Sequence, residues 1–558
     1  MSSNSPKPNN RTILLFFFFF ISLIFPFFLP VFVNSSRTLS LHKSKLRFDD
    51  GQNLTFLWPL PSQFTSGNQT LTVDPNLSFV FSGNGGRSSY IVEEAFQRYK
   101  NIIFKYSSKV SKSGVVYDLQ KLNVIVHSDN DELQLGVDES YSLLVAKNYE
   151  HSIIGEITIE ANSVYGALRG LETLSQLCVF DYGAKTVLVF KAPWFIQDKP
   201  RFEFRGLSLD TSRHYYPVDV IKQVIESMSY AKLNVFHWHI LDEESFPLEV
   251  PRYPNLWRGA YTKWERYTVE DAQEIVSFAK MRGINVMAEV DVPGHAESWG
   301  KGYPDLWPSS SCTEPLDVSK NFTFDVISGI LADMREIFPF KLFHLGGDEV
   351  NTDCWNSTPH VKQWLQDHNM TTKDAYQYFV LRAQEIALSH NWTPVNWEET
   401  FNAFPSKLNP QTVVHNWLGP GVCPKAVAKG FRCIFSNQGV WYLDHLDVPW
   451  DDVYFAEPLE GIKDASEQQL VLGGEVCMWS ETADPSNAQQ TIWPRAAAAA
   501  ERLWSNRDAT SATDTNSSTL NRLEYFRCLL TRRGIPAAPV RNHYGRSPPT
   551  GPGSCYVQ

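Results

Sequence analysis

Several features that would assign this sequence to a particular class of protein are missing from it. It has no excess of positive charge, since 50 basic and 61 acidic residues give a net charge of -11 at pH 7. We therefore expect no nucleic-acid partner and no stable membrane partner. The spacings CxxC and HExxH, which often mark bound metal, are also absent, and we expect no catalytic metal and no cofactor. Neutral or cationic substrates fit this charge better.

The N-terminus has the order of segments that a secretory signal requires. Lys7 and Arg11 precede an apolar run over residues 13–33, and a polar segment follows. We assign residues 1–36 to a signal peptide, with an uncleaved anchor as the alternative, because about 20 apolar residues can span a bilayer. Pro26 and Pro30 favour cleavage. In either case the rest of the chain is expected to enter the secretory pathway.

A secretory destination gives meaning to the sequons and the cysteines. The N-x-S/T sequons beyond residue 36 become expected glycan acceptors; they are Asn53, Asn68, Asn76, Asn321, Asn356, Asn369, Asn391 and Asn516. The chain also has eight cysteines, and in an oxidising compartment these favour disulfides over metal ligation.

The 558 residues are enough for two domains. Residues 50–195 mix short β-type runs, such as 122–127, with helical stretches such as the one beginning at Ile91, and predict a smaller N-terminal α/β domain. The segment 191–202 contains Pro193 and Pro200, which interrupt regular structure and mark a domain junction. Residues 200–558 are assigned to a second domain with a C-terminal tail.

Beyond Phe204, short apolar runs alternate with helical segments. Eight such runs occur, near residues 204, 234, 284, 342, 393, 412, 431 and 471. Apolar strands separated by helices indicate a parallel sheet, and eight of them are the number that closes a (β/α)₈ barrel. The predicted fold class is α/β, a barrel of this TIM type preceded by the smaller α/β domain; an open α/β sheet is the alternative.

Residues suited to chemistry end or follow nearly every predicted strand, with Arg205 lying within the first, and active sites of this fold form where the strands end. In chain order they are Arg205, His239, Asp242, Asp291, His295, Asp348, Glu349, Trp397, Glu398, Glu399, Trp417, Tyr442, Asp444, Trp479 and Glu481. Acidic groups beside several tryptophans favour glycoside hydrolysis, in which a carboxylic acid protonates the leaving oxygen and aromatic rings grip the sugar.

Five motifs carry a more specific resemblance. They are HLGGDE (344–349), HWHILDEESFP (237–247), DVPGHAESWG (291–300), WYLD (441–444) and GGEVCMWSE (473–481). Together they resemble the signatures of the β-N-acetylhexosaminidases of glycoside hydrolase family 20, most of all the plant vacuolar type. The resemblance implies a vacuolar enzyme, or an extracellular one as the second choice, that acts on glycans and forms a homodimer in many relatives.

This family uses the 2-acetamido group of its own substrate as the nucleophile. The resemblance implies that Glu349 is the general acid and base, with a raised pKa, and that Asp348 orients and stabilises the acetamide. It also implies that Tyr442 donates to the acyl oxygen. Adjacent residues of a strand point to opposite faces, so Asp348 and Glu349 can share a site only where the strand turns, and Gly346 and Gly347 permit such a turn.

The remaining roles come from the same resemblance. Arg205 and Glu481 are expected to bind the 3- and 4-hydroxyls, and Asp444 the 6-hydroxyl. Trp397, Trp417 and Trp479 are expected to wall the acetamide pocket and support the ring. Asp242 and His295 are expected to act behind the catalytic pair. An ion pair in the core is the alternative role of Arg205, and packing is that of the tryptophans. Ser480 replaces the glycine usual between Trp and Glu, which puts the contact of Glu481 in question.

The resemblance also implies disulfides between Cys312 and Cys354 and between Cys528 and Cys555. Cys423 and Cys433 are close enough in sequence to pair, and Cys477 is interpreted as a small buried residue of the eighth strand. The pairing of Cys178 stays open.

Two other functions compete with the hexosaminidase. A retaining glycosidase could use Glu398 or Glu399 as a covalent nucleophile, with Glu349 as the acid, and would need no acetamido group. A lectin-like or inactive protein could use the same barrel only to bind sugar. An intact set of Asp348, Glu349 and Tyr442 argues against the second of these.

Overall fold

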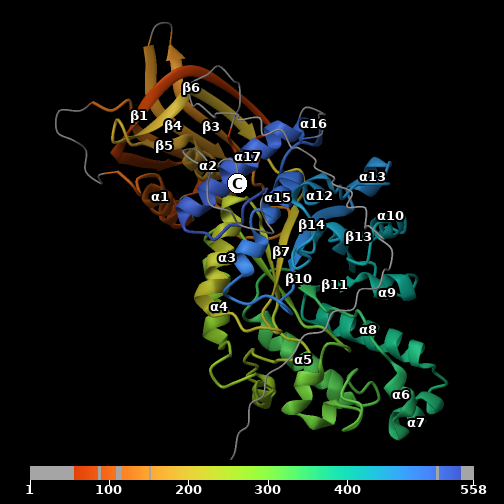
Figure 1. Ribbon diagram of the computed structural model, residues 1–558. Helices are drawn as coiled ribbons and strands as arrows, with labels where there is room; N and C mark the ends of the chain where they lie inside the picture. Colours follow the sequence, from red (N-terminus) through yellow and green to blue (C-terminus); the bar gives the residue numbers. More distant parts are fainter. Residues whose placement is uncertain (1–55, 86–88, 108–115, 150–151, 511–514, 542–558) are drawn as a thin grey trace, which may run out of the picture. The chain divides into compact units, whose positions relative to one another are not determined.

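The computed structural model describes residues 56–85, 89–107, 116–149, 152–510 and 515–541 (Figure 1). The chain divides into two compact units, and all statements below concern Gly51–Gln558. The predicted signal peptide at residues 1–36 lies outside the described residues. Within those ranges no helix has the length and the apolar character that a membrane crossing requires.

The N-terminal part of this unit is a mixed sheet of six strands with order β1-β2-β4-β3-β6-β5. Helices α1 and α2 pack against each other, and α2 contacts β2, β3 and β4. The elements are β1 (Gln63–Ser82), α1 (Ser89–Ile103), β2 (Leu119–Val126), β3 (Tyr141–Tyr149), β4 (Ser152–Ala161), α2 (Val164–Leu177), β5 (Cys178–Asp181) and β6 (Thr186–Asp198). A smaller α/β fold at this position is as predicted.

The expected break at Pro193 is wrong. Strand β6 continues through Pro193 to Asp198, and it pairs with β1 on one side and β3 on the other. The register with β1 shifts near Gln69, which pairs with Ala192, and such an irregularity lets a strand accept a residue that lacks an N–H donor. Pro200 does lie between the last strand of this sheet and the next strand of the chain.

The second part is a closed barrel of eight parallel strands, β7 to β14. All eight apolar runs of the sequence form its strands: β7 (Phe204–Asp210), β8 (Val235–His239), β9 (Asn285–Glu289), β10 (Leu342–His344), β11 (Thr393–Trp397), β12 (Val413–Asn416), β13 (Arg432–Phe435) and β14 (Val471–Met478). Strand β14 pairs with β7, and this pairing closes the sheet and excludes the open alternative.

Helices and short turns of 3₁₀-helix connect the strands. They are α3 (Val218–Tyr230), η2 (Pro254–Gly259), α4 (Val269–Lys280), η3 (Glu297–Lys301), η4 (Pro304–Leu306), α5 (Asn321–Arg335), α6 (Asp353–Ser357), α7 (Pro359–Asp367), α8 (Thr372–Ser389), α9 (Glu398–Ala403), α10 (Val422–Val427), α11 (Gln438–Trp441), α12 (Trp450–Phe455), α13 (Ala465–Gln468), α14 (Ala488–Ile492), α15 (Arg495–Trp504), α16 (Arg507–Thr510) and α17 (Thr515–Arg533). Helices α4 and α8 begin with capping boxes, at Thr268 and Asp271 and at Thr371 and Asp374, which satisfy free backbone N–H groups.

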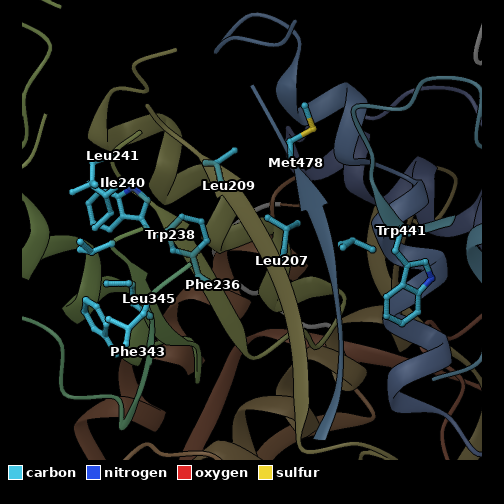
Figure 2. Packing of buried hydrophobic residues seen from close by; sticks show 14 of the residues in the cluster. Leu207, Leu209, Phe236, Trp238, Ile240, Leu241, Phe343, Leu345, Trp441 and Met478 are labelled. Atoms are coloured by element: carbon cyan, nitrogen blue, oxygen red, sulfur yellow. The ribbon is translucent and has the colours of Figure 1, made fainter. Parts of the chain in front are cut away.

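The side of the barrel wall that faces the helices is apolar. Figure 2 shows Leu207 and Leu209 on β7 close to Phe236 and Trp238 on β8, with Met478 on β14. These side chains are fully buried, and each such burial contributes about 1.5–3 kcal/mol. The large buried surface fixes the strands, and therefore the loops at their ends.

Side chains inside the barrel form layers, because alternate residues of a strand point to opposite faces. An apolar cluster towards the amino-terminal ends contains one residue from every strand: Phe204, Val235, Met287, Leu342, Val395, Val413, Ile434 and Leu472. The next layer is buried and polar: His237, Glu289, His344, His415 and Glu475. Towards the carboxyl ends follows an aromatic cluster, Trp397 and Tyr442 with Cys477, against which Trp417 and Trp479 pack.

The disulfides agree with the expectations that fall on described residues. Cys312 bonds Cys354, and Cys423 bonds Cys433. Cys477 is buried and free in β14. Cys178 is also free. Cys555, the expected partner of Cys528, lies outside the described residues.

The sequons are accessible wherever the structure describes them. Their asparagines are exposed at Asn68, Asn76, Asn321, Asn356, Asn369 and Asn391. Asn53 and the side chain of Asn516 lie outside the described residues. Glycosylation stays a prediction.

Arg205 occupies the amino-terminal end of β7 and does not reach the mouth of the barrel. It is fully buried, and its Nη2 lies 2.6 Å from Glu139 Oε2 of the N-terminal part. Arg169 pairs with the same oxygen at 2.8 Å. Burial would raise the pKa of Glu139, but the charges of Arg205 and Arg169 outweigh this effect and lower it. The expected role of Arg205 in binding sugar hydroxyls is therefore wrong, and the alternative, a core ion pair, is what the structure contains.

We predict that Arg205→Met destabilises the protein by about 3–5 kcal/mol, because it leaves part of the buried Glu139 charge uncompensated. The measurement is the free energy of unfolding in urea. The matched control is Lys121→Met, which breaks a half-exposed pair with Glu156 and should cost less than about 1 kcal/mol. Equal losses for the two variants would contradict the structural role of Arg205.

Candidate active site

The turn after β10 brings Asp348 and Glu349 to the same side. The strand ends at His344, and Gly346, Gly347 and Glu349 all have positive φ angles, of 60°, 98° and 49°. A Cβ atom on Gly346 would lie only 1.9 Å from the carboxyl carbon of Asp291, so the chain passes too close to Asp291 for any side chain at this position. The N–H of Gly347 donates to Asp291 Oδ1 at 2.8 Å and fixes the turn. The turn expected from the two glycines is present.

His295 joins the two carboxylates. Its Nε2 lies 3.7 Å from Asp348 Oδ2 and 3.6 Å from Glu349 Oε2. The side chain of Asp348 is 13% exposed and that of Glu349 is 59% exposed. Burial would lower the pKa of His295, but the carboxylates of Asp348 and Asp291 raise it far above its ordinary value, so the imidazole is a cation.

The cation at His295 acts on Glu349 in a direction opposite to the sequence-based expectation. Its contact with Glu349 lowers the pKa of that carboxyl group, and this effect exceeds that of burial. A raised pKa was expected for a proton donor. In the same neighbourhood, burial and the charge of Asp348 raise the pKa of Asp291 well above its ordinary value.

Asp242 holds His295 from behind, as expected for a supporting residue. Asp242 Oδ1 lies 3.0 Å from His295 Nδ1, while Oδ2 is 2.7 Å from His239 Nε2. The backbone N–H of His295 donates to Glu314 Oε1 at 2.9 Å. Because both ring nitrogens of His295 face carboxylates, the ring cannot rotate without losing an ion pair.

Arg213 is a site residue that the sequence analysis missed. It follows β7, and its guanidinium lies 2.8 Å from Asp242 Oδ2 and 4.0 Å from Glu481 Oε1. It also lies over the ring of Trp479, 5.6 Å from the ring centroid. The available signal was its place just after the first strand, where a barrel forms its active site, whereas Arg205 stands at the start of that strand.

Tyr442 and three tryptophans form one apolar cluster near Asp348. Trp417 stacks on Tyr442 with ring centroids 6.2 Å apart, and Trp479 lies 6.0 Å from Tyr442. The Nε1–H of Trp397 donates to Glu289 Oε1 at 3.0 Å. Burial, then Cys477 and Asp348, raises the pKa of Tyr442, so its hydroxyl keeps its proton and can donate it. These four residues come together as expected.

Asp444 and Glu481 are also near each other. Burial raises the pKa of Asp444 to about 6, with a further contribution from the charge of Glu481. Ser480 is fully buried, and its hydroxyl donates to the backbone oxygen of Asp210 at 2.7 Å. The serine therefore bonds the loop before Glu481 to β7.

Glu398 and Glu399 both accept hydrogen bonds from neighbouring groups. Glu398 Oε2 accepts hydrogen bonds from the side chain of Asn416 at 2.5 Å and from the backbone N–H of Trp417 at 2.8 Å. Glu399 accepts the indole N–H of Trp417 at 3.0 Å. Burial and the charge of Asp348 raise the pKa of Glu399 to about 8, so at acid pH it is neutral. The hydrogen bonds that Glu398 accepts and the raised pKa of Glu399 both disfavour a role as covalent nucleophile.

Three groups of side chains have donor atoms close enough to hold a metal. Among the described residues they are His237 with His415 and Glu475, His237 with Glu289 and His344, and Asp291 with His295 and Asp348. In the first two groups the donors already pair with one another; His237 Nδ1, for example, lies 2.8 Å from Glu475 Oε1. The expectation that no metal takes part stays a prediction.

Comparisons with known proteins agree with this geometry. Residues 202–507 match the family described as glycosyl hydrolase family 20, catalytic domain, and residues 57–177 match the family described as beta-acetyl hexosaminidase like. The chain is 68% identical to beta-hexosaminidase 1 of Arabidopsis thaliana over 93% of this chain and 98% of that protein. It is 54% identical to beta-hexosaminidase 3 of the same plant, over 92% and 95%.

A solved structure shows a similar fold. The chitobiase of Flavobacterium johnsoniae superposes with a TM-score of 0.75 at 31% sequence identity, over 86% of this chain and 73% of that one.

We predict that Gly346→Ala moves the turn that carries Asp348 and Glu349. The new methyl group would overlap Asp291, and a positive φ is unfavourable for alanine, so the turn must shift. We expect catalytic turnover to fall at least about a hundredfold, because a displacement of about 1 Å has such an effect. Gly419→Ala is the control, since its Cβ would meet nothing within 4 Å. Turnover that is equal in the two variants would contradict the importance of the turn.

Proposed function

This protein belongs to glycosyl hydrolase family 20 and is a beta-hexosaminidase that removes terminal N-acetylhexosamine, and we propose that it uses a substrate-assisted, retaining mechanism. Its proposed substrates are the non-reducing β-linked N-acetylglucosamine and N-acetylgalactosamine ends of N-glycans or chitin-type oligosaccharides. The proposed compartment is the vacuole, with the extracellular space second, and the proposed assembly is a homodimer.

The observation that carries the mechanism is the environment of Asp348. Its Oδ1 is buried and has no hydrogen-bond partner among the described residues, yet its charge reaches Tyr442 in the aromatic cluster. A carboxylate oxygen of this kind needs a donor, and the N–H of a 2-acetamido group would provide one. Tyr442 supplies an O–H for the acyl oxygen of the same group. The acetamide is then held between an acceptor and a donor, with aromatic rings around its methyl group.

The reaction proceeds in two steps in this proposal. The acyl oxygen attacks the anomeric carbon while Glu349 gives its proton to the glycosidic oxygen, so the sugar becomes an oxazolinium ion and the aglycone leaves as an alcohol. Asp348 balances the positive charge of that ion. Water then adds to the anomeric carbon and gives its proton to Glu349, which restores the enzyme and the acetamide.

This mechanism requires that substrate binding raise the pKa of Glu349. In the free enzyme its pKa is lowered by His295, and more than half of its side chain is exposed. A sugar placed over Glu349 excludes water from it, and desolvation raises the pKa of a carboxylic acid. The proton is therefore proposed to become available on binding.

The hydroxyl-binding roles are proposed for residues at the mouth. Arg213 and Glu481 are the pair proposed to bind the 3- and 4-hydroxyls, because Arg213 lies beside Trp479 and Glu481 where Arg205 does not. Asp444 is proposed to bind the 6-hydroxyl, and its Oδ1 is buried without a partner among the described residues.

We predict that Asp348→Asn lowers kcat by about a hundredfold or more on aryl β-N-acetylglucosaminide, because an amide cannot balance the oxazolinium charge. The assay compares aryl glycosides of N-acetylglucosamine, N-acetylgalactosamine and glucose, and the wild-type enzyme should cleave only the first two. The urea midpoint should stay near that of the wild type. Equally fast cleavage of the glucoside would refute the substrate-assisted mechanism.

Glu399→Gln is the matched control for this experiment. Glu399 is near Asp348 and is the candidate nucleophile of the alternative mechanism, so an equally severe loss in this variant, with covalent labelling of the wild-type residue, would favour that alternative.

We predict that His295→Gln moves the basic limb of the kcat/KM profile to higher pH. The cation lowers the pKa of Glu349 in the free enzyme, and the acid is active only when protonated. Removing the cation raises that pKa, so the active form persists to higher pH even though the rate itself falls. A basic limb that stays in place, or moves to lower pH, would show that His295 does not set the protonation of Glu349.

A further inference from the structure

The polar layer inside the barrel continues directly into the catalytic centre. Three members of this layer and three residues nearer the mouth form an alternating series of three carboxylates and three histidines, here called the charge chain: Glu475, His237, Glu289, His239, Asp242 and His295. Strands β14, β8 and β9 and the loops after β8 and β9 contribute its members. All of them except His295 are fully buried. Its last member contacts Asp348 and Glu349.

The contacts along the charge chain are short at every link. His237 Nδ1 lies 2.8 Å from Glu475 Oε1, and its Nε2 lies 3.0 Å from Glu289 Oε2. The same oxygen of Glu289 is 2.6 Å from His239 Nδ1. His239 Nε2 is 2.7 Å from Asp242 Oδ2, and Asp242 Oδ1 is 3.0 Å from His295 Nδ1.

This geometry favours doubly protonated rings for the histidines of the charge chain. A neutral imidazole has one N–H and one lone pair, so it would direct a lone pair at a carboxylate oxygen. In each histidine of the charge chain both nitrogens lie close to carboxylates, which favours the doubly protonated ring. Among the described residues His237 Nε2 makes no hydrogen bond, and Arg213 Nη2 lies 3.4 Å from His295 Nδ1. Burial would lower the pKa of His237, but Glu475 and Glu289 raise it to about 9; burial would likewise lower that of His239, which Glu289 and Asp242 raise to about 10.

The two histidines beside the charge chain, His344 and His415, are in surroundings that favour their neutral forms. His344 lies 2.9 Å from Glu289 Oε1 and 3.1 Å from His415, and burial lowers the pKa of both. His415 Nε2 also lies 2.8 Å from Ser436 Oγ and 3.8 Å from Glu475 Oε1. A Cβ on Gly206 would come within 2.6 Å of Glu475 Oε2, so the missing side chain on β7 makes room for this carboxylate.

Other groups face the charge chain along its length. Cys477 is 3.8 Å from Glu475 Oε1, and Trp397 donates to Glu289 Oε1. The guanidinium of Arg213 lies 2.8 Å from Asp242 and is shared with Asp210 and Glu244. Asp291 lies close enough to Glu289 for their charges to interact. Within the chain itself three positive charges meet three negative ones.

We propose that Glu475, His237, Glu289 and His239 are positioning residues of the catalytic centre, whose balanced charges hold Asp242 and His295 in place and set the acid limb of the pH profile. This inference rests on the proposed roles of Asp348 and Glu349. None of the four residues is expected to touch the sugar. They act because a charge left unbalanced in a buried interior is felt over a longer distance than one in water.

Removing one negative charge shows how the chain would act. Glu289→Gln leaves one excess cation while His237 and His239 both keep their two protons. That cation opposes the positive charge of the oxazolinium ion, so kcat/KM falls at acid pH. As the pH rises, one imidazole loses its proton, the amide N–H of the glutamine can bond the freed nitrogen, and the balance returns. The acid limb should therefore move to higher pH by on the order of one unit.

The experiment measures kcat/KM against pH for the wild type, Glu289→Gln and Glu475→Gln, with aryl β-N-acetylglucosaminide as the substrate. The acid limb should move for both variants, and less for Glu475→Gln, which is further from Asp348. The double variant Glu289→Gln with His239→Gln removes one charge of each sign and should return the limb towards its wild-type place. An acid limb that stays at its wild-type pH in both single variants, or a double variant shifted further than Glu289→Gln, would overturn the proposal.

Glu139→Gln is the control for simple loss of stability. Glu139 is also a fully buried, ion-paired carboxylate, but it lies at the opposite end of the barrel. This variant should have a lower urea midpoint and an unchanged acid limb. A similar shift of the limb in this variant would mean that the shift reports a loosened fold, and the proposal would be wrong.

Nitrogen-15 NMR of the histidine rings tests the chain without any variant or substrate. His237 and His239 should show two protonated nitrogens from pH 4 to pH 8. Neutral rings in that range would overturn the proposal even if the enzyme were active. Doubly protonated rings in an enzyme that does not cleave N-acetylhexosaminides would instead refute the proposed function, while the charge state proposed for the charge chain would stand.

Discussion

A closed sheet of eight strands places every second side chain inside the barrel, and this constraint governs the whole site. Position 235 fills the apolar base, position 237 two residues later lies in the polar layer, and position 239 reaches the level of the catalytic loops. The intervening Trp238 points to the helices and packs in the outer core. The motif HWH thus supplies two members of the charge chain, His237 and His239, and one large apolar side chain, Trp238. The packing of Trp238 fixes the position of the strand and therefore of both imidazoles.

The turn after β10 depends on the same packing. Asp291 occupies the space that a side chain at position 346 would need, and it accepts the N–H of Gly347. Asp348 and Glu349 then meet His295, which Asp242 and Glu314 hold from two directions. The two carboxylates therefore differ in environment although they are adjacent in sequence: one is largely enclosed and the other is mostly exposed. A stabilising anion and a proton donor need environments that differ in this way.

Much of this could be predicted from the sequence because it is local. Each of the eight apolar runs became a strand, and the residues after them, such as His295 and Trp417, came to the mouth. The predictions that failed concern features that depend on position along a strand or on partners distant in the sequence. Arg205 and Arg213 are only eight positions apart, but they lie at opposite ends of β7. No local pattern in the sequence indicates that Arg205 pairs with Glu139. Pro193 lies inside β6 because a shift in the partner strand accommodates it, and the ion pairs between Glu475 and His237 join residues far apart in the chain.

The direction of the pKa shift at Glu349 follows from this architecture. The His295 cation lies beside Asp348, and the same cation favours the ionised form of Glu349. In the free enzyme, solvent around the exposed Glu349 adds to this preference. In the proposed mechanism both effects weaken when a sugar covers Glu349, because water leaves and the acetamide takes over part of the interaction with Asp348. Under that proposal the donor gains its proton affinity from the substrate. The fixed charges behind His295 then matter most, since they are the part of the electrostatic field that substrate binding does not change.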